Sequence, residues 1–192
     1  MSKQARILTK TEFNTVLAVI DSKKHAQRNR TVMFLSFYAG LRAKEIASLQ
    51  MFNVVDDNRK VKTQFVLQKH QTKGSQSQCV FISTKLQKHL QKYVDSVCAT
   101  YSPTDAFIKS QNGSAFSPLA IVQLFARIYK NANIKDASSH SGRRQFISSL
   151  ANKSVNVRVI QALARHSNLN TTMLYIDYDS VKLSNAVDLV DV

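Results

Sequence analysis

The sequence is poor in the residues that mark several classes of protein. It contains no tryptophan, two prolines, two cysteines and four glycines among 192 residues, and it has no internal repeat or low-complexity linker. Cys79 and Cys98 lack the spacing of metal ligands or of a Cys-x-x-Cys pair, so we interpret both as reduced thiols without a functional role. No apolar run approaches the roughly 20 residues of a membrane span, and the N-terminus lacks the pattern of a secretory signal. The sequence therefore predicts a cytoplasmic protein without a membrane partner.

Acidic residues are also scarce. The chain carries 12 Asp and Glu against 27 Lys and Arg, a net charge of +15 and a pI near 10.0. This excess predicts a polyanionic partner, because phosphate contacts and counterion release turn positive charge into affinity. An anionic membrane surface is the alternative. With 44% hydrophobic residues and no break in composition, we expect one domain over residues 1–192.

The hydrophobic periodicity predicts an α+β fold that is mostly helical with one small antiparallel β-hairpin. Capping boxes predict helices that begin at Thr9 and Thr84, and Ser117 followed by proline predicts a third helix. Residues 31–41 are apolar almost all round, as expected for a central buried helix, and Gly40 interrupts them. The predicted buried faces are Phe13, Val16, Leu17 and Ile20; Leu86, Leu90, Tyr93, Val94 and Val97; and Ile121, Leu124, Phe125 and Ile128.

Two further segments have distinct compositions. Residues 61–67 and 79–82 flank a polar stretch that includes Gly74, which predicts a β-hairpin with a mobile tip. Residues 23–30 are basic, and the sequence leaves open whether they form a solvated face or contact phosphate.

The residues with the most chemical potential lie in the last quarter of the chain. On a helix, His140 and Arg143 would project from the same side and could reach one phosphate, with Arg144 close to that side. The alternative is a solvated basic helix face with His140 as a capping residue. Nine residues separate His166 from Tyr175, and the polar segment between them predicts a turn with an N-cap that returns the phenol towards the imidazole.

Taken together, the motifs resemble those of one known family. They are Ala39-Gly40-Leu41-Arg42-x-x-Glu45, Thr72-Lys73-Gly74, His140-x-x-Arg143, His166-Ser167 and Thr171-Thr172-x-x-Tyr175. In this order and spacing they are similar to the catalytic domain of the tyrosine recombinase (phage integrase) family, over about residues 7–190. The resemblance implies the fold of this catalytic domain. It also implies that the protein is a site-specific DNA recombinase or integrase that forms a covalent 3′-phosphotyrosyl intermediate.

The resemblance also implies a role for each motif residue. Arg42 and Arg143 would clamp the scissile phosphate with His140 and His166 beside it. Lys73 would protonate the leaving 5′-oxygen, with Lys69 as the alternative, and Tyr175 would be the nucleophile, with Tyr178 as its rival. Glu45 would buttress Arg42. The residues expected to contact DNA are Lys44, Lys69, Arg144 and Arg165.

General chemistry agrees with these roles. Guanidinium groups stay ionised and bind phosphate oxygens bidentately, so two arginines can replace a metal ion. We therefore expect neither a cofactor nor a metal. A phenol has a pKa near 10 and needs a base, for which His140 is the first candidate.

The sequence departs from the family pattern at three places. Arg165 stands where glycine is usual, Gly142 stands where leucine is frequent, and we expect no N-terminal core-binding domain. Either the protein is a naturally short recombinase, or a partner or a removed segment supplies the domain that closes a clamp around DNA. The expected partners are double-stranded recombination sites and further copies of the chain, as a tetramer on DNA. A helix-turn-helix regulator built on residues 156–175 and a type IB topoisomerase are the competing functions.

Overall fold

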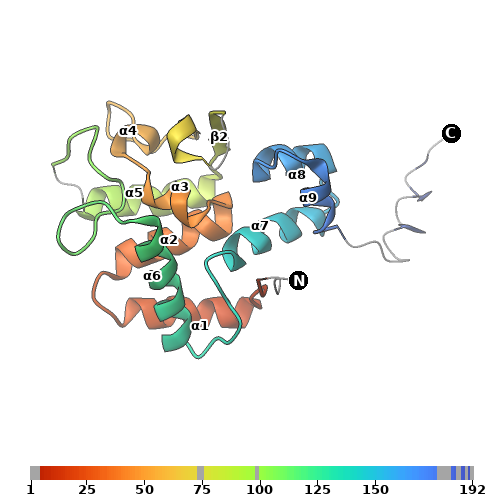
Figure 1. Cartoon of the computed structure of the whole chain (residues 1–192), viewed down its shortest axis with the longest axis horizontal. Coiled ribbons are helices and arrows are strands. Elements are labelled where there is room, and N and C mark those ends of the chain that lie inside the picture. The colour runs from red at the N-terminus through yellow and green to blue at the C-terminus, as the bar shows by residue number, and fades with distance from the viewer. Residues whose placement is uncertain are drawn as a thin grey trace. The chain divides into compact units, whose positions relative to one another are not determined.

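The computed structural model describes residues 5–72, 76–97, 100–176, 183–184, 187–188 and 190, with the side chain of Val97 excepted. These residues are mostly helical and include one two-stranded antiparallel sheet (Figure 1), which confirms the predicted fold class. The chain divides into two compact units, Met1–Phe146 and Ile147–Val192. None of the helices in the described ranges is both long and apolar enough to cross a membrane.

The first unit is built around a buried helix. α1 (Lys10–Asp21) begins at Thr9, where the predicted capping box is present: the N–H of Glu12 donates to the Thr9 hydroxyl at 3.2 Å and the Thr9 N–H donates to the Glu12 carboxylate at 2.9 Å. α2 (Ala26–Ala39) packs against α1, α3 (Ala43–Ala47) and α5 (Thr84–Val97). Because neighbours surround this part of it, α2 is buried on nearly every face over residues 31–39, which agrees with the central buried helix predicted for residues 31–41.

The predicted hairpin is present. β1 (Gln64–Leu67) pairs with β2 (Gln78–Phe81) with Phe65 opposite Val80, and Phe65 and Leu67 are buried while Val66 between them is exposed. The strands are shorter than predicted, because Val61 pairs instead with Val55 after α4 (Met51–Val54). A single 3₁₀ turn, η1 (Lys69–Gln71), follows β1. The predicted tip residue Gly74 lies outside the described residues.

The cap of α5 differs from the prediction by one residue. The Ser83 hydroxyl, not that of Thr84, accepts from a first-turn N–H, that of Leu86, at 3.3 Å. The side chain of Gln87 does not reach back to the cap, because its amide donates to the carbonyl of Val61 at 2.6 Å. The predicted face is otherwise correct: Leu86, Leu90, Tyr93 and Val94 are buried.

α6 (Pro118–Asn131) completes the first unit and packs against α1 and α3. Its predicted cap is confirmed, since the Ser117 hydroxyl accepts from the N–H of Ala120 at 3.1 Å and Pro118 occupies the first helical position. The predicted stripe of Ile121, Leu124, Phe125 and Ile128 is buried.

α7 (Ser141–Ala151) begins in the first unit and ends in the second. The second unit also contains α8 (Val157–Ala164) and α9 (Leu169–Met173), which contact each other. Asn168 caps α9 through its side chain, which accepts from the N–H of Asn170 at 2.8 Å. This confirms the turn predicted between His166 and Tyr175.

Candidate active site

Arg42 lies in the short segment that joins α2 to α3. α2 ends because Gly40 adopts the left-handed conformation (φ 62°), and Arg42 is extended at the N-cap of α3. The Arg42 N–H donates to Oε2 of Glu45 at 2.9 Å, and Nη1 donates to Oε1 at 2.7 Å. The Glu45 side chain is 1% exposed and that of Arg42 24% exposed. The buried carboxylate therefore holds a guanidinium that remains accessible at the surface.

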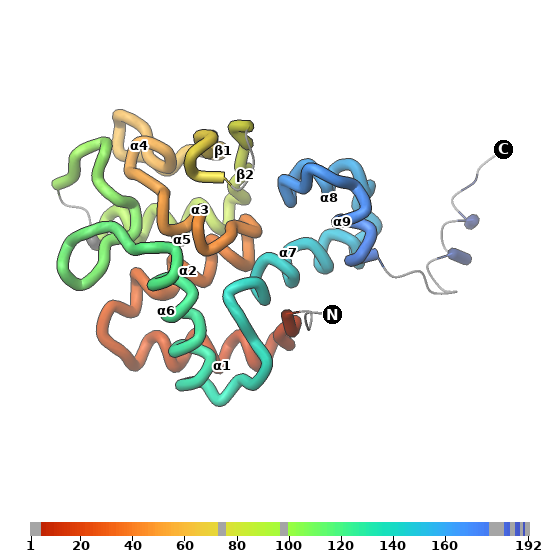
Figure 2. The backbone as a smooth tube through the Cα atoms, viewed as in Figure 1, coloured from red at the N-terminus to blue at the C-terminus, as the bar shows by residue number. Residues whose placement is uncertain are grey.

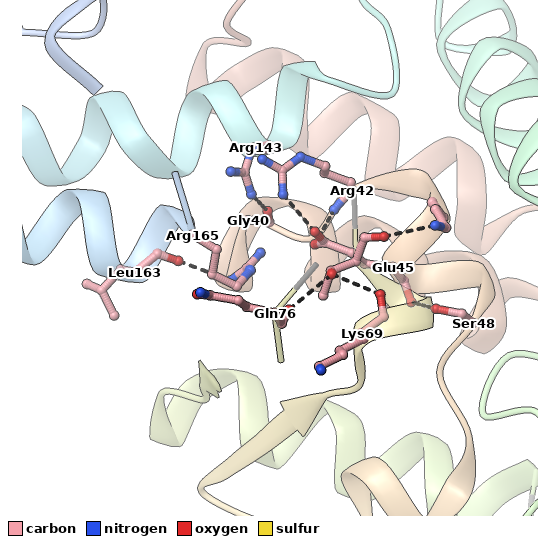
Figure 3. Close-up of polar contacts among 11 residues, drawn as sticks. Gly40, Arg42, Glu45, Ser48, Lys69, Gln76, Arg143, Leu163 and Arg165 are labelled. Carbon is pink, nitrogen blue, oxygen red and sulfur yellow. Dashed lines mark hydrogen bonds and ion pairs between the residues drawn. The ribbon is translucent and has the colours of Figure 1, made fainter. Parts of the chain in front are cut away.

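Arg143 approaches the same segment from α7. It is buried, and its Nη1 donates to the carbonyl of Gly40 at 2.6 Å. In Figure 3, Arg143 reaches Gly40 from α7, and Arg42, two residues after Gly40, is bonded to Glu45. The alternative interpretation of Arg143 as part of a solvated basic face is therefore wrong.

Gly142 allows this approach. A Cβ atom at residue 142 would lie 2.6 Å from the ring of Phe37 and in contact with the hydroxyl of Ser36, both in α2. Cβ atoms are essentially never found so close to other heavy atoms, so a side chain at residue 142 would not fit unless Phe37 or Ser36 moved. Glycine at this position therefore brings the first turn of α7 against α2.

His140 and Arg144 differ in part from the prediction. α7 begins at Ser141, so His140 precedes the helix and is exposed; its carbonyl accepts from the Arg144 N–H at 2.9 Å. His140 is thus the N-cap residue of α7, one turn before Arg143. Arg144 is half-buried, and its Nη1 donates to the carbonyl of Ala5 at 2.7 Å.

The start of the hairpin tip is tied to α3. Nζ of Lys44 donates to the carbonyl of Thr72 at 2.8 Å, and the amide of the buried Gln71 donates to the carbonyl of Ser48 at 2.6 Å. Lys69 is exposed, and its carbonyl accepts from the Thr72 hydroxyl at 3.1 Å (Figure 3). Lys73 lies outside the described residues, but the residue before it is fixed to the helix that carries Glu45.

In the second unit, His166 and Tyr175 are neighbours, as predicted. Their ring centroids are 6.1 Å apart and the ring planes are inclined by 28°. Nδ1 of His166 lies 2.9 Å from the hydroxyl of Thr172, which is fully buried. The Tyr175 N–H donates to the Thr172 carbonyl at 3.0 Å, so one threonine positions both residues.

The backbone at Arg165 has a conformation that favours glycine, the usual residue before His166 in the family pattern. It is the C-cap of α8 and has a positive φ of 56°, a conformation that costs less for glycine than for other residues. It is also buried, and its Nη1 donates to the carbonyl of Leu163 at 3.0 Å. A DNA contact by this side chain therefore stays a prediction that would require it to reorient.

The first unit thus carries Arg42, His140 and Arg143, and the second carries His166 and Tyr175. A model of the phage integrase family matches residues 6–181 of this sequence. The chain belongs to the phage integrase family. The match runs through both compact units and confirms the predicted resemblance.

Relatives of this phage integrase family member are named tyrosine recombinases. One from Thermosipho africanus is 26% identical over 185 residues, which cover 91% of this chain and 60% of the relative. One from Pseudothermotoga lettingae is 30% identical over 151 residues, which cover 78% of this chain and 49% of the relative. The chain thus spans about half to three fifths of the length of these relatives.

Solved structures of the family share the fold. The crystal structure of XerA recombinase superimposes with a TM-score of 0.73 at 18% identity, over 98% of this chain and 64% of that chain. The Tn1549 transposon integrase in complex with circular intermediate DNA gives a TM-score of 0.74 at 19% identity, over 98% of this chain and 66% of that chain. These similarities confirm the recombinase catalytic-domain fold.

Two contacts at the site were not predicted from the sequence. One is the hydrogen bond between Thr172 and His166. Thr172 belongs to the Thr-Thr-x-x-Tyr motif, so the motif was the sequence signal that could have indicated this bond. The bond from Lys44 to Thr72 joins residues 28 positions apart, and no local pattern indicates it.

Proposed function

We propose that this phage integrase family member cleaves and rejoins DNA strands, with Tyr175 as the nucleophile. The observation that carries the proposal is the arrangement of His166, Thr172 and Tyr175. Tyr175 is half-buried, its ring lies 6.1 Å from that of His166, and Thr172 bonds both residues.

In the proposed reaction, the Tyr175 phenolate oxygen attacks the scissile phosphorus while the bond to the 5′-oxygen breaks. The phenol proton passes to a base, with His140 as the first candidate, and Lys73 donates a proton to the leaving oxygen. The product is a 3′-phosphotyrosyl bond and a 5′-hydroxyl. A second 5′-hydroxyl reverses the reaction, so the phosphoester energy is conserved without ATP.

Arg42 and Arg143 would stabilise the transition state. Charge grows on the non-bridging oxygens, and preorganised guanidiniums favour the transition state without reorganising during the reaction. Glu45 and the Gly40 carbonyl hold the two arginines in advance. No metal is required in this scheme.

For partners, we propose double-stranded recombination sites, a tetramer of the chain on DNA, and an accessory or clamp-completing protein, in the cytoplasm of a prokaryotic cell. The net charge of +15 supports a DNA partner. The DNA complexes of the Tn1549 integrase, and of a lambda integrase dimer bound to a core site, supply the analogy. Lys44, Lys69, Arg144 and Arg165 would contribute DNA contacts.

The test uses nicked suicide duplexes taken from the DNA that flanks the gene. We expect the natural chain to form a covalent protein–DNA adduct, Tyr175→Phe to form none, and Tyr178→Phe to retain it. Mass spectrometry that located the nucleotide on Tyr178, or an adduct with Tyr175→Phe, would overturn the assignment. A regulator would form no adduct, and a topoisomerase would relax DNA without requiring two sites.

A further inference from the structure

A basic hollow lies in the first unit, between the turn that joins α1 to α2, the loop before α6, and α6 itself. Figure 2 shows this turn beside that loop. The volume is about 530 Å³, within the range of about 300–1,000 Å³ typical of small-ligand sites. All the ionisable side chains on its wall are basic: Lys23, Lys24, His25, Arg28 and Arg127.

These charges repel one another. Desolvation, followed by the charges of Arg28 and Lys24, lowers the pKa of His25. Burial lowers the pKa of Arg28; Tyr93 raises it, and the charge of Arg127 lowers it. Among the described residues no carboxylate lines the hollow, so a bound anion would relieve the repulsion.

Two aspartates of the first unit are paired with other basic residues. Asp21, at the end of α1, pairs with Arg30, and Asp105 pairs with Lys109 at 2.8 Å. Neither aspartate is part of the wall. The cluster of like charges is therefore not balanced within the hollow.

The wall is formed in advance. Nε and Nη2 of Arg28 donate to Oδ1 of Asn29 at 3.1 and 3.0 Å, and the guanidinium lies 5.2 Å from the centre of the Phe116 ring. His25 is held in the left-handed conformation (φ 65°), and its side chain makes no capping bond to α2.

The remaining wall residues suit a heterocycle more than a bare anion. Val19 and Phe116, which are partly exposed, provide an apolar surface, and Asn112 and Asn131 provide amides that both donate and accept hydrogen bonds. A site for inorganic phosphate alone would need neither property.

We propose that this hollow binds a nucleotide, with its phosphates at Lys23, Lys24 and Arg127 and its base against the apolar wall. The nucleotide can be free or can belong to a nucleic acid strand, because the recognised chemistry is the same. This assigns Lys23 and Lys24, at the start of the basic stretch of residues 23–30, to phosphate contact.

The hollow is separate from the phosphate site proposed above. His25 precedes α2 and Gly40 follows it, and a helix of 14 residues is about 20 Å long. The proposal does not depend on strand cleavage, and its test needs no catalysis.

The experiment is an NMR titration of the full chain with ADP, adenosine, inorganic phosphate and a 12-nucleotide single strand. We expect ADP to shift the His25 imidazole signals and to raise its pKa. The triple variant Lys23→Gln/Lys24→Gln/Arg127→Gln should weaken ADP binding at least about tenfold, or about 1.4 kcal/mol. The control Lys88→Gln/Lys92→Gln/Lys130→Gln removes the same charge from exposed positions outside the hollow and should change the affinity less than about twofold.

Each outcome has a defined meaning. Absence of a His25 shift, equal losses in the two triple variants, or phosphate binding as tight as ADP would overturn the proposal. Competition by the strand at lower nucleotide concentration than ADP identifies a nucleic acid source, and binding of ADP alone identifies a free nucleotide. Lys24→Gln and Arg127→Gln singly replace the triple variant if it does not fold.

Discussion

The hydroxyl of Thr172 lies 2.9 Å from Nδ1 of His166, and the Thr172 carbonyl accepts the N–H of Tyr175. Thr172 is fully buried, and His166 is partly buried. One residue thus fixes the orientation of the histidine and the start of the segment that carries the proposed nucleophile.

We expect Thr172→Val to slow adduct formation about fivefold, because an ordinary hydrogen bond contributes about 1 kcal/mol. The ¹⁵N shifts of the His166 ring should report a changed tautomer balance, which a purely structural defect would not produce. Thr171→Val is the matched control, since Thr171 is exposed. Unchanged ring shifts in Thr172→Val would contradict this role.

Glu45 should act through Arg42. We expect Glu45→Gln to slow adduct formation about tenfold, because charge-assisted bonds contribute about 1.5–3 kcal/mol. In an Arg42→Lys background the same change should slow adduct formation much less, because Glu45 is bonded directly to Arg42 and the effects of the two substitutions are coupled. Single-turnover rates of the four proteins measure the coupling, and additive effects would count against it.

Gly142→Ala should destabilise the protein by about 1–3 kcal/mol, because the added methyl group meets Phe37 and Ser36 within the buried helix α2. Urea denaturation measures the change. Ser148→Ala, on the same helix, is the control and should be close to neutral. Equal stability of the two variants would mean that α7 can shift away from α2 at no cost.

Lys73 should act as a general acid on the leaving oxygen. We expect Lys73→Ala to slow cleavage of ordinary DNA much more than cleavage of a 5′-bridging phosphorothiolate, whose sulfur leaves without a proton. Lys44→Met should show the same pattern more weakly, because Lys44 fixes the carbonyl of the preceding Thr72. If Lys73→Ala slowed cleavage of both substrates equally, Lys73 would not be the general acid. If Lys69→Ala slowed only cleavage of ordinary DNA, Lys69 would have that role.

The C-terminal segment should dock on a neighbouring protomer when DNA is bound. Most of residues 180–192 lie outside the described residues, but Leu183, Val187 and Val190 are 56%, 70% and 70% exposed. Truncation after Tyr178 should therefore reduce synaptic assembly on DNA, measured by gel shift with two sites. Unchanged assembly would support packing of the segment on its own domain.

Local rules determined much of the fold from the sequence alone. The caps at Thr9, Ser117 and Asn168 depend on bonds between residues two or three positions apart, so composition and spacing suffice to place them. The buried faces of α5 and α6 follow from helical periodicity in the same way. The order of the motif residues is likewise read directly from the sequence.

Other features of the fold and of the site depend on tertiary contacts. Ser83 caps α5 in place of Thr84 while Gln87 bonds to Val61, and Gly142 is required by Phe37 of another helix. The sequence could not show these contacts, because each depends on which distant segment packs beside it. The same reason applies to the Lys44 bond with Thr72 and to the basic hollow, where Arg127 joins residues about a hundred positions earlier.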